Sequence, residues 1–144
     1  MTAAIGAKFG IDLDGLDTSI TVRRFAEASD GNIHTDSWTK AVTMLIYFNE
    51  EWTSETGALR MLRSATDIED YAAEVPPLAG TMLAFKRDEK SFHGHKRFEG
   101  ERRMLQMSWV RPSKTASLAL RVKRLTTRAA KHLHIARDSN VQES

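Results

Sequence analysis

The chain of 144 residues contains no cysteine. Without a thiol it cannot form a disulfide, a thiolate metal site or a cysteine nucleophile, so any metal must be held by histidine and carboxylate side chains. No apolar run approaches the roughly 20 residues of a membrane-spanning helix, and the N-terminus lacks a basic segment followed by an apolar core. We therefore expect a soluble, cytoplasmic protein without a transmembrane segment.

Charge is nearly balanced over the whole chain but unevenly distributed along it. Residues 111–144 hold eight Lys or Arg against only Asp138 and Glu143, whereas the residues before them are net acidic. The length and the 41% of hydrophobic residues suit one globular domain with a buried core. We predict a compact body over residues 1–111 and a basic extension over residues 112–144.

Five stretches of the body have the length and the β-branched or aromatic content of strands. They cover residues 19–27, 40–49, 58–63, 80–85 and 103–110. Turn-forming residues separate them at short intervals, as in an antiparallel sandwich or barrel. Within the body, only residues 67–75 are expected to form a short helix.

The basic extension has a different period, because its apolar residues recur at three- and four-residue steps. These residues are Leu118, Val122, Leu125, Ala129 and Leu133. The spacing, with Lys and Arg between the apolar positions, predicts an amphipathic helix. We expect its apolar stripe to pack on the body, on a second copy in a homodimer or on an acidic partner. An anionic membrane surface is the rival, and nucleic acid is not an expected partner.

Histidines and a carboxylate stand next to the predicted strands. His34 and Asp36 precede the most apolar strand, and residues two apart in an extended segment point to the same face. A lone pair of this kind arises often by chance. His93, which follows the strand ending at Phe85, offers a third ligand. Two histidines and one carboxylate on a β-scaffold form the facial triad of non-haem iron(II) oxygenases, which leaves three coordination positions open.

Two adjacent arginines begin the last strand of the body. A 2-oxo acid that chelates the iron would leave its far carboxylate inside the protein, where a planar guanidinium suits it. Because neighbouring strand residues face opposite ways, one arginine of the pair must point outward. We expect Arg103 to face inward and Arg102 outward. The alternative is that both are solvated at a strand end.

Four segments, in this order and spacing, resemble the 2-oxoglutarate/Fe(II)-dependent oxygenase superfamily, particularly its prolyl-hydroxylase-like branch. They read HTDSWTKAVTMLIYFNEEW, TGALRML, EVPPLAGTMLAF and SFHGHKRFEGERRMLQMSWV. The resemblance covers about residues 20–110. It implies a mainly β fold, a double-stranded β-helix of the jelly-roll type, followed here by the C-terminal amphipathic basic helix.

The resemblance also implies roles for single residues. It makes His34, Asp36 and His93 the iron ligands, and Tyr47 the phenol that hydrogen-bonds the co-substrate carboxylate. It makes Arg103 the anchor of that carboxylate.

The anchor is assigned by spacing within the last segment. The six-residue step from Arg103 to Trp109 favours Arg103, while the nine-residue step from His93 to Arg102 also occurs in such families.

Three further residues are candidate substrate contacts. Trp38 and Lys40 lie just past the iron-binding pair, and His95 lies two residues from His93. Exposed loop or mouth positions without a task are the alternative for all three.

The resemblance implies oxidative decarboxylation of 2-oxoglutarate to succinate and carbon dioxide, coupled to hydroxylation of a second substrate. Fe(II) would be the cofactor, molecular oxygen the other co-substrate and ascorbate an optional reductant. Peptidyl proline, a free amino acid, a sugar and a lipid-linked saccharide all suit the reaction. Only about thirty residues precede His34, so we expect a minimal or N-terminally shortened domain.

Two other functions stay open at this point. A cupin-like metal enzyme would bind iron without using 2-oxoglutarate and would not need Arg103. A non-catalytic β-sandwich binding module with a basic docking tail would need neither iron nor co-substrate.

Overall fold

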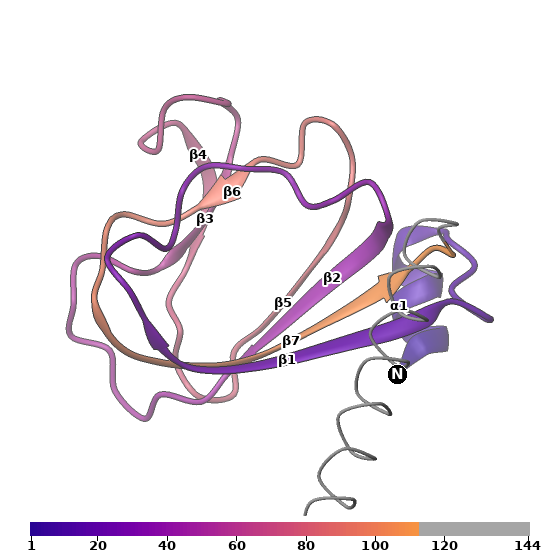
Figure 1. Ribbon diagram of the computed structural model, residues 1–144, viewed down its shortest axis with the longest axis horizontal. Coiled ribbons are helices and arrows are strands. Elements are labelled where there is room, and N and C mark those ends of the chain that lie inside the picture. Colours follow the sequence, from indigo (N-terminus) through magenta and orange to yellow (C-terminus); the bar gives the residue numbers. More distant parts are fainter. Residues whose placement is uncertain (113–144) are drawn as a thin grey trace, which may run out of the picture. The chain divides into compact units, whose positions relative to one another are not determined.

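The computed structural model describes residues 1–112, which form one short helix and seven strands (Figure 1). The elements are α1 (Thr2–Phe9), β1 (Asp17–Ala26), β2 (Lys40–Tyr47), β3 (Leu59–Leu62), β4 (Tyr71–Val75), β5 (Met82–Lys86), β6 (His93–Gly94) and β7 (Gly100–Val110). The helix in this described part of the chain is not long and apolar enough to cross a membrane.

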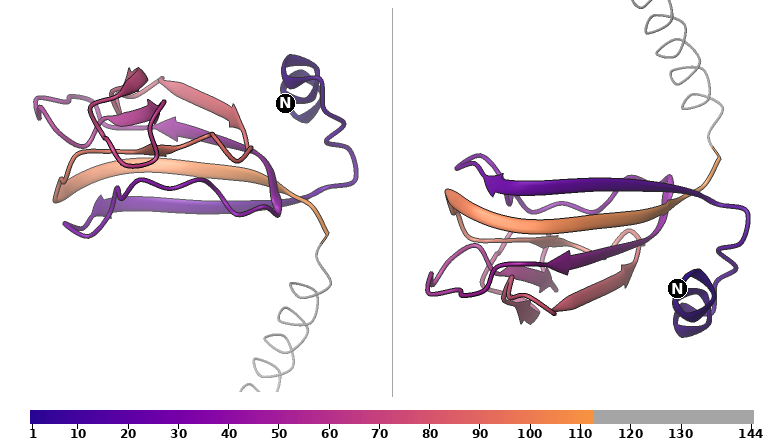
Figure 2. Two further views of the ribbon diagram at one scale, coloured as in Figure 1. Left: turned by 90° about the horizontal axis from the view of Figure 1, so that it is seen from above. Right: turned by 90° about the horizontal axis from the view of Figure 1, so that it is seen from below.

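The strands form two antiparallel sheets. The larger sheet has the order β1-β7-β2-β5 and the smaller sheet the order β4-β3-β6. Figures 1 and 2 show the smaller sheet on one side of the larger one, and α1 at the end where β1 begins and β7 ends. This mainly β, antiparallel arrangement is consistent with the predicted jelly-roll type.

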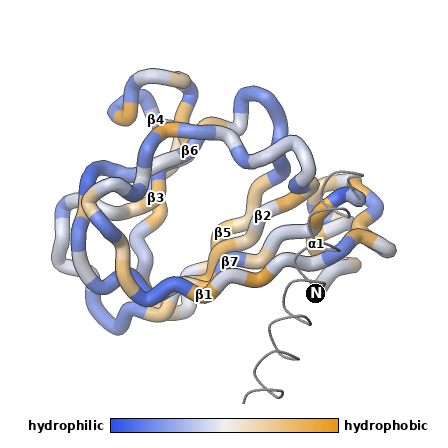
Figure 3. Tube along the Cα trace, viewed as in Figure 1, coloured by the Kyte–Doolittle hydropathy of each residue, from blue (hydrophilic) through white to orange (hydrophobic). Residues whose placement is uncertain are grey.

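Side-chain alternation along β2 produces two apolar clusters on opposite faces of the larger sheet. On one face, Val42 and Met44 pack with Trp109 of β7 and with Ile5 of α1. On the other face, Leu45 and Tyr47 pack with residues of β3, β5 and β7, namely Leu59, Phe85 and Met104. The second face therefore points toward the smaller sheet. Figure 3 shows hydrophobic stretches along β2 and β5.

The five strands expected from the sequence correspond to β1, β2, β3, β5 and β7. The short helix expected over residues 67–75 is wrong, because this segment contains β4, which pairs with β3. Pairing with a neighbouring strand outweighs the helix propensity of the Ala and Glu residues there.

Two further findings concern helices. The sequence did not lead us to expect α1, an Ala-rich segment that ends at Gly10 with a left-handed φ of 62°. Glycine adopts this conformation without a steric penalty, so it suits the end of a helix. The predicted C-terminal helix lies outside the described residues.

Candidate metal centre

A pair of backbone hydrogen bonds brings the two histidines of the predicted triad together. The His34 N–H donates to the His93 carbonyl at 3.0 Å, and the His93 N–H donates to the His34 carbonyl at 2.9 Å. This isolated antiparallel bridge lies at β6, and it leaves the two ring centroids 4.3 Å apart. Residues 59 positions apart in the sequence therefore present their imidazoles side by side.

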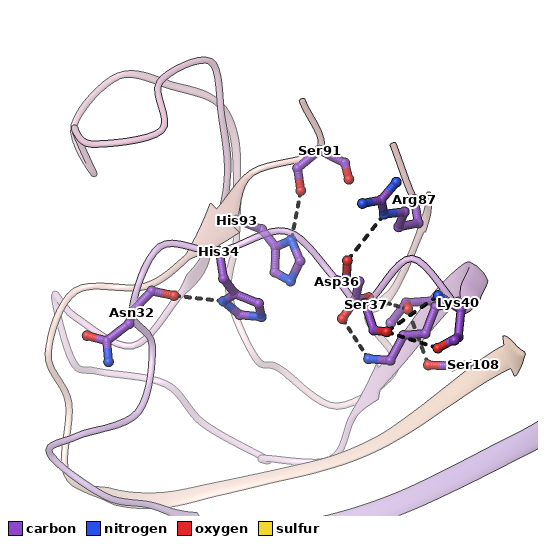
Figure 4. A network of polar contacts seen from close by, with 11 residues as sticks. Asn32, His34, Asp36, Ser37, Lys40, Arg87, Ser91, His93 and Ser108 are labelled. Carbon is purple, nitrogen blue, oxygen red and sulfur yellow. Dashed lines mark hydrogen bonds and ion pairs between the residues drawn. The ribbon is translucent and has the colours of Figure 1, made fainter. Parts of the chain in front are cut away.

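Backbone carbonyls fix the orientation of both rings (Figure 4). His34 Nδ1 lies 2.8 Å from the Asn32 carbonyl oxygen, and His93 Nδ1 lies 3.0 Å from the Ser91 carbonyl oxygen. Because a carbonyl only accepts, each Nδ1 carries the hydrogen and each Nε2 keeps its lone pair. A second partner of this kind orients metal-binding histidines in proteins.

Asp36 supplies the carboxylate and is itself held on several sides. Thr43 Oγ1 donates to Asp36 Oδ2 at 2.5 Å, and Lys40 Nζ lies 2.6 Å from Asp36 Oδ1. The Arg87 Nε–H donates to the Asp36 backbone carbonyl at 3.2 Å. Burial raises the pKa of Asp36, but the hydrogen bonds from Lys40 and Thr43 outweigh it, so the pKa lies below the ordinary value.

The three side chains meet in a geometry that suits a metal ion. One ligand atom from each of His34, Asp36 and His93 lies within 4.8 Å of the other two. Burial lowers the pKa of His93, which keeps this imidazole neutral near pH 7 and available as a ligand. Two imidazole nitrogens and one carboxylate oxygen are the donor set that non-haem Fe(II) takes, so the residues present fit iron.

The metal centre opens into a cavity of about 310 Å³ between the two sheets. Side chains from the C-terminal end of β1, the N-terminal half of β7, the inner face of β2 and β5 line it, including Phe25, Thr43, Leu45, Phe85, Arg102, Met104 and Gln106. The cavity is large enough for a small organic co-substrate beside the metal ligands.

Arg102, and not Arg103, points into this cavity. Arg102 is 6% exposed and lines the cavity. Arg103 has a side chain that is 44% exposed and forms a 3.0 Å ion pair with Glu101 on the surface. The expected orientation of the two arginines is therefore wrong.

The alternation of β7 explains this correction. Arg103 shares its face with Trp109, which packs under α1 on the side of the sheet away from the cavity. Arg102 shares its face with Met104, Gln106 and Ser108, and two of these, Met104 and Gln106, line the cavity. The six-residue step to Trp109 placed Arg103 correctly with the tryptophan, but on the outer face.

Arg102 is held by uncharged groups alone. Its Nε–H donates to the Gly57 carbonyl at 2.9 Å, its Nη2 donates to the Tyr47 hydroxyl at 3.2 Å, and its Nη1 lies 3.2 Å from Met104 Sδ. No ion pair reaches its guanidinium from residues 1–112. Burial lowers the pKa of Arg102 below its ordinary value, although the guanidinium remains charged.

Tyr47 is fully buried beneath Arg102 and does not line the cavity. Burial raises the pKa of Tyr47, so its hydroxyl is neutral and accepts the hydrogen bond from the guanidinium. In this arrangement, Tyr47 positions Arg102.

The three candidate substrate contacts occupy different places. Lys40 and His95 line the cavity, whereas Trp38 is 61% exposed and does not. Burial lowers the pKa of His95, and its Nδ1 lies 2.9 Å from the Lys96 carbonyl oxygen. Sequence reasoning missed Gly31, whose φ is +88° and whose Cα faces the His95 ring so closely that a Cβ would lie 2.4 Å from it.

Comparison with known families and structures gives three findings. The profile described as the 2OG-Fe(II) oxygenase superfamily matches residues 20–111. None of the curated proteins matches the chain. Among solved structures, the chain is similar to a prolyl-4-hydroxylase from Pseudomonas putida, with a TM-score of 0.57 and 23% sequence identity.

The similarity to the Pseudomonas prolyl-4-hydroxylase concerns the fold, and it extends over part of each chain. It covers 76% of this chain, which spans only 59% of the Pseudomonas protein. A weaker similarity, with a TM-score of 0.35 and 9% identity, links 67% of this chain to 87% of a protein of the disulfide-linked pili of Bacillus endospore appendages, and it supports no argument.

Proposed function

We propose, from the premise that this chain belongs to the 2OG-Fe(II) oxygenase superfamily, that it is an Fe(II)- and 2-oxoglutarate-dependent dioxygenase that hydroxylates a second substrate. When bound, the iron would supply the oxygen chemistry that couples decarboxylation of 2-oxoglutarate to hydroxylation, with release of succinate and carbon dioxide. The protein supplies binding, orientation and a sheltered cavity.

Each residue of the centre has a task in this proposal. His34, His93 and Asp36 would hold the metal, the histidines through Nε2. Thr43 fixes the Asp36 carboxylate from the buried side, where Ser108 Oγ in turn lies 3.2 Å from Thr43 Oγ1. These contacts fix the direction of the carboxylate before any ligand arrives, and such preorganisation reduces the entropy lost on binding.

Arg102 is the observation that carries the assignment of 2-oxoglutarate. A guanidinium has five N–H donors, and three of those on Arg102 reach groups of the protein. The other two have no partner among the described residues. A buried cation with two such donors at a cavity that also holds the metal ligands suits the far carboxylate of a metal-chelating 2-oxo acid.

The same observation separates this proposal from its nearest rival. A cupin-like enzyme without a 2-oxo acid would have no use for a buried guanidinium that lacks a carboxylate partner, since burying a charge without one is unfavourable. The second substrate is less constrained. Prolyl peptides are the first candidates to test, because the similar Pseudomonas protein is a prolyl-4-hydroxylase. Amino acids and saccharides come next.

Anaerobic difference spectroscopy with Fe(II) and 2-oxoglutarate tests the proposal. We expect the native chain to develop the weak visible metal-to-ligand charge-transfer band of a chelated 2-oxo acid. Replacing Arg102 by Gln should raise the 2-oxoglutarate concentration needed for this band by at least about thirty-fold. Loss of one partner of a buried charged pair costs roughly 2–5 kcal/mol, which corresponds to such a change.

The adjacent arginine provides the matched control. Arg103→Gln removes an identical charge one residue away and should leave the band and its 2-oxoglutarate dependence unchanged, because Arg103 pairs with Glu101 outside the cavity. Absence of the band in the native chain would contradict the proposed function. A band that survives Arg102→Gln but is lost in Arg103→Gln would contradict the assignment of the anchor.

A further inference from the structure

The Lys40 ammonium forms an ion pair with Asp36, the carboxylate of the candidate metal centre. Lys40 Nζ lies 2.6 Å from Asp36 Oδ1, and its side chain is only 23% exposed. The other oxygen, Oδ2, accepts the hydrogen bond from Thr43. Both oxygens of Asp36 are therefore engaged, one of them by a cation (Figure 4).

A metal ion bound to Asp36 would oppose the contact between Asp36 and Lys40. Two cations that share one carboxylate repel each other, and the repulsion is strong where water is largely excluded. The Coulomb attraction between Asp36 and the ammonium also falls when the carboxylate shares its charge with a divalent ion. A mostly buried ammonium then needs another acceptor.

The described residues offer Lys40 no second carboxylate in the cavity. The only other acidic side chain that lines it is Asp30, which lies 3.4 Å from Arg23 Nη1 and accepts a hydrogen bond from the Glu27 backbone N–H. Arg102 would already be satisfied by 2-oxoglutarate. The loaded cavity thus retains one cation that has no partner among residues 1–112 and can take one from a bound ligand.

Further positive charge lies beside the same loop. Arg87 donates to the Asp36 carbonyl, and Arg111 Nη1 donates to the carbonyls of Trp38 and Lys40 at 3.2 and 3.0 Å. Both arginines donate to backbone carbonyls of residues 36–40, so they add positive charge to the segment that carries Lys40. Together they make the local potential favourable for an anion.

We propose that Lys40 is a specificity-determining residue that is released from Asp36 by the metal and then binds an oxyanion, a carboxylate in the first instance, on the second substrate. This inference rests on the proposed function and specifies its substrate class as acidic. It also assigns Lys40 a second effect, which is to compete with the metal for Asp36.

Nuclear magnetic resonance of the lysine ammonium groups tests the release. Zn(II), a diamagnetic divalent ion, is added to the full chain together with 2-oxoglutarate, and each ammonium is followed in 1H–15N spectra. We expect the Lys40 signal to shift on Zn(II) addition, while the signal of Lys86, which is exposed and forms no ion pair among the described residues, stays in place. Acetate should then shift the Lys40 signal again, and neutral acetamide should not.

Calorimetry of Zn(II) binding tests the competition. Lys40→Met keeps an unbranched side chain without the charge and should bind Zn(II) several-fold more tightly than the native chain. Lys40→Arg should restore weaker binding, and Lys86→Met, a matched control on β5, should bind Zn(II) as the native chain does. A purely structural role for Lys40 would not produce tighter binding.

The outcomes separate this inference from the proposed function. If the chain binds Zn(II) and 2-oxoglutarate while the Lys40 signal is unmoved and Lys40→Met binds Zn(II) no more tightly, only the inference is overturned. If acetamide and acetate shift the signal equally, the acidic substrate class is overturned. Failure to bind Zn(II) at all would overturn both proposals.

Discussion

At the scale of single residues, the contact between Gly31 and His95 shapes the mouth of the cavity. Gly31 has a φ of +88°, and a Cβ there would lie 2.4 Å from the His95 imidazole. The imidazole thus packs directly against backbone, which holds it at the cavity wall. Only glycine allows this approach, since any other residue would meet both backbone strain and a steric clash.

Gly31→Ala should therefore destabilise the chain more than strain alone would. Gly80 is the matched control, because its φ is +82° and nothing lies within 4 Å of the position that a Cβ would take. Gly80→Ala should lower the free energy of unfolding by roughly 1–2 kcal/mol, the penalty of a left-handed conformation. Gly31→Ala should lower it further, because the His95 ring must move. Equal losses in urea unfolding would show that the contact with His95 does not constrain the chain.

At the scale of elements, Arg60 fastens β4 to β3. Arg60 is 5% exposed, forms ion pairs with Glu74 of β4 and with Glu69, and places its guanidinium 4.4 Å from the centre of the Tyr71 ring. These contacts reach both ends of β4. They give a physical reason why this segment, which carries residues compatible with a helix, is a strand.

We expect Arg60→Met to lower the free energy of unfolding by about 1–2 kcal/mol. The value is modest because water screens the two partly exposed carboxylates, whereas a fully buried pair would lose roughly 3–5 kcal/mol. Arg63→Met is the control, since Arg63 pairs with Asp70 at 3.5 Å on the surface with a side chain that is 62% exposed. Thermal unfolding would contradict this role of Arg60 if the two variants melted at the same temperature.

At the scale of the described body, α1 covers only part of the apolar outer face of the larger sheet, and a row of apolar side chains on this face is partly exposed. Val22, Leu105, Ile46 and Met82 lie opposite one another across all four strands. Val22 is 75% exposed and Met82 is 56% exposed. Contiguous apolar surface of this kind commonly marks an interaction site or a tendency to associate.

Val22→Lys should reduce both the binding of a hydrophobic dye and the concentration-dependent association of the chain, with little change in melting temperature. A charge on an exposed edge strand opposes pairing with other chains, and an exposed position contributes little to the core. Thr21→Lys is the control, because Thr21 is exposed on the opposite face of β1. Fluorescence and light scattering that respond equally to both variants would show that net charge, and not the apolar row, governs association.

Much of the site follows from local sequence. The pattern of His34 and Asp36 before an apolar strand, with His93 after the strand that ends at Phe85, predicted a triad that the structure brings within ligand distance. The strands were predictable because alternation and turn residues act over a few positions. The resemblance to the 2-oxoglutarate/Fe(II)-dependent oxygenase superfamily is confirmed by the family match over residues 20–111.

Only the tertiary structure decided which arginine faces the cavity. Strand alternation requires that Arg102 and Arg103 point to opposite sides, but it does not tell which side of a sheet is the interior. That depends on α1, which covers the face of Trp109, and on the smaller sheet, which encloses the other face. The ion pair between Lys40 and Asp36 was not predicted either, because it too depends on how the elements pack. Sequence determines the periodicity of side chains, while the packing of distant elements determines what each periodic face meets.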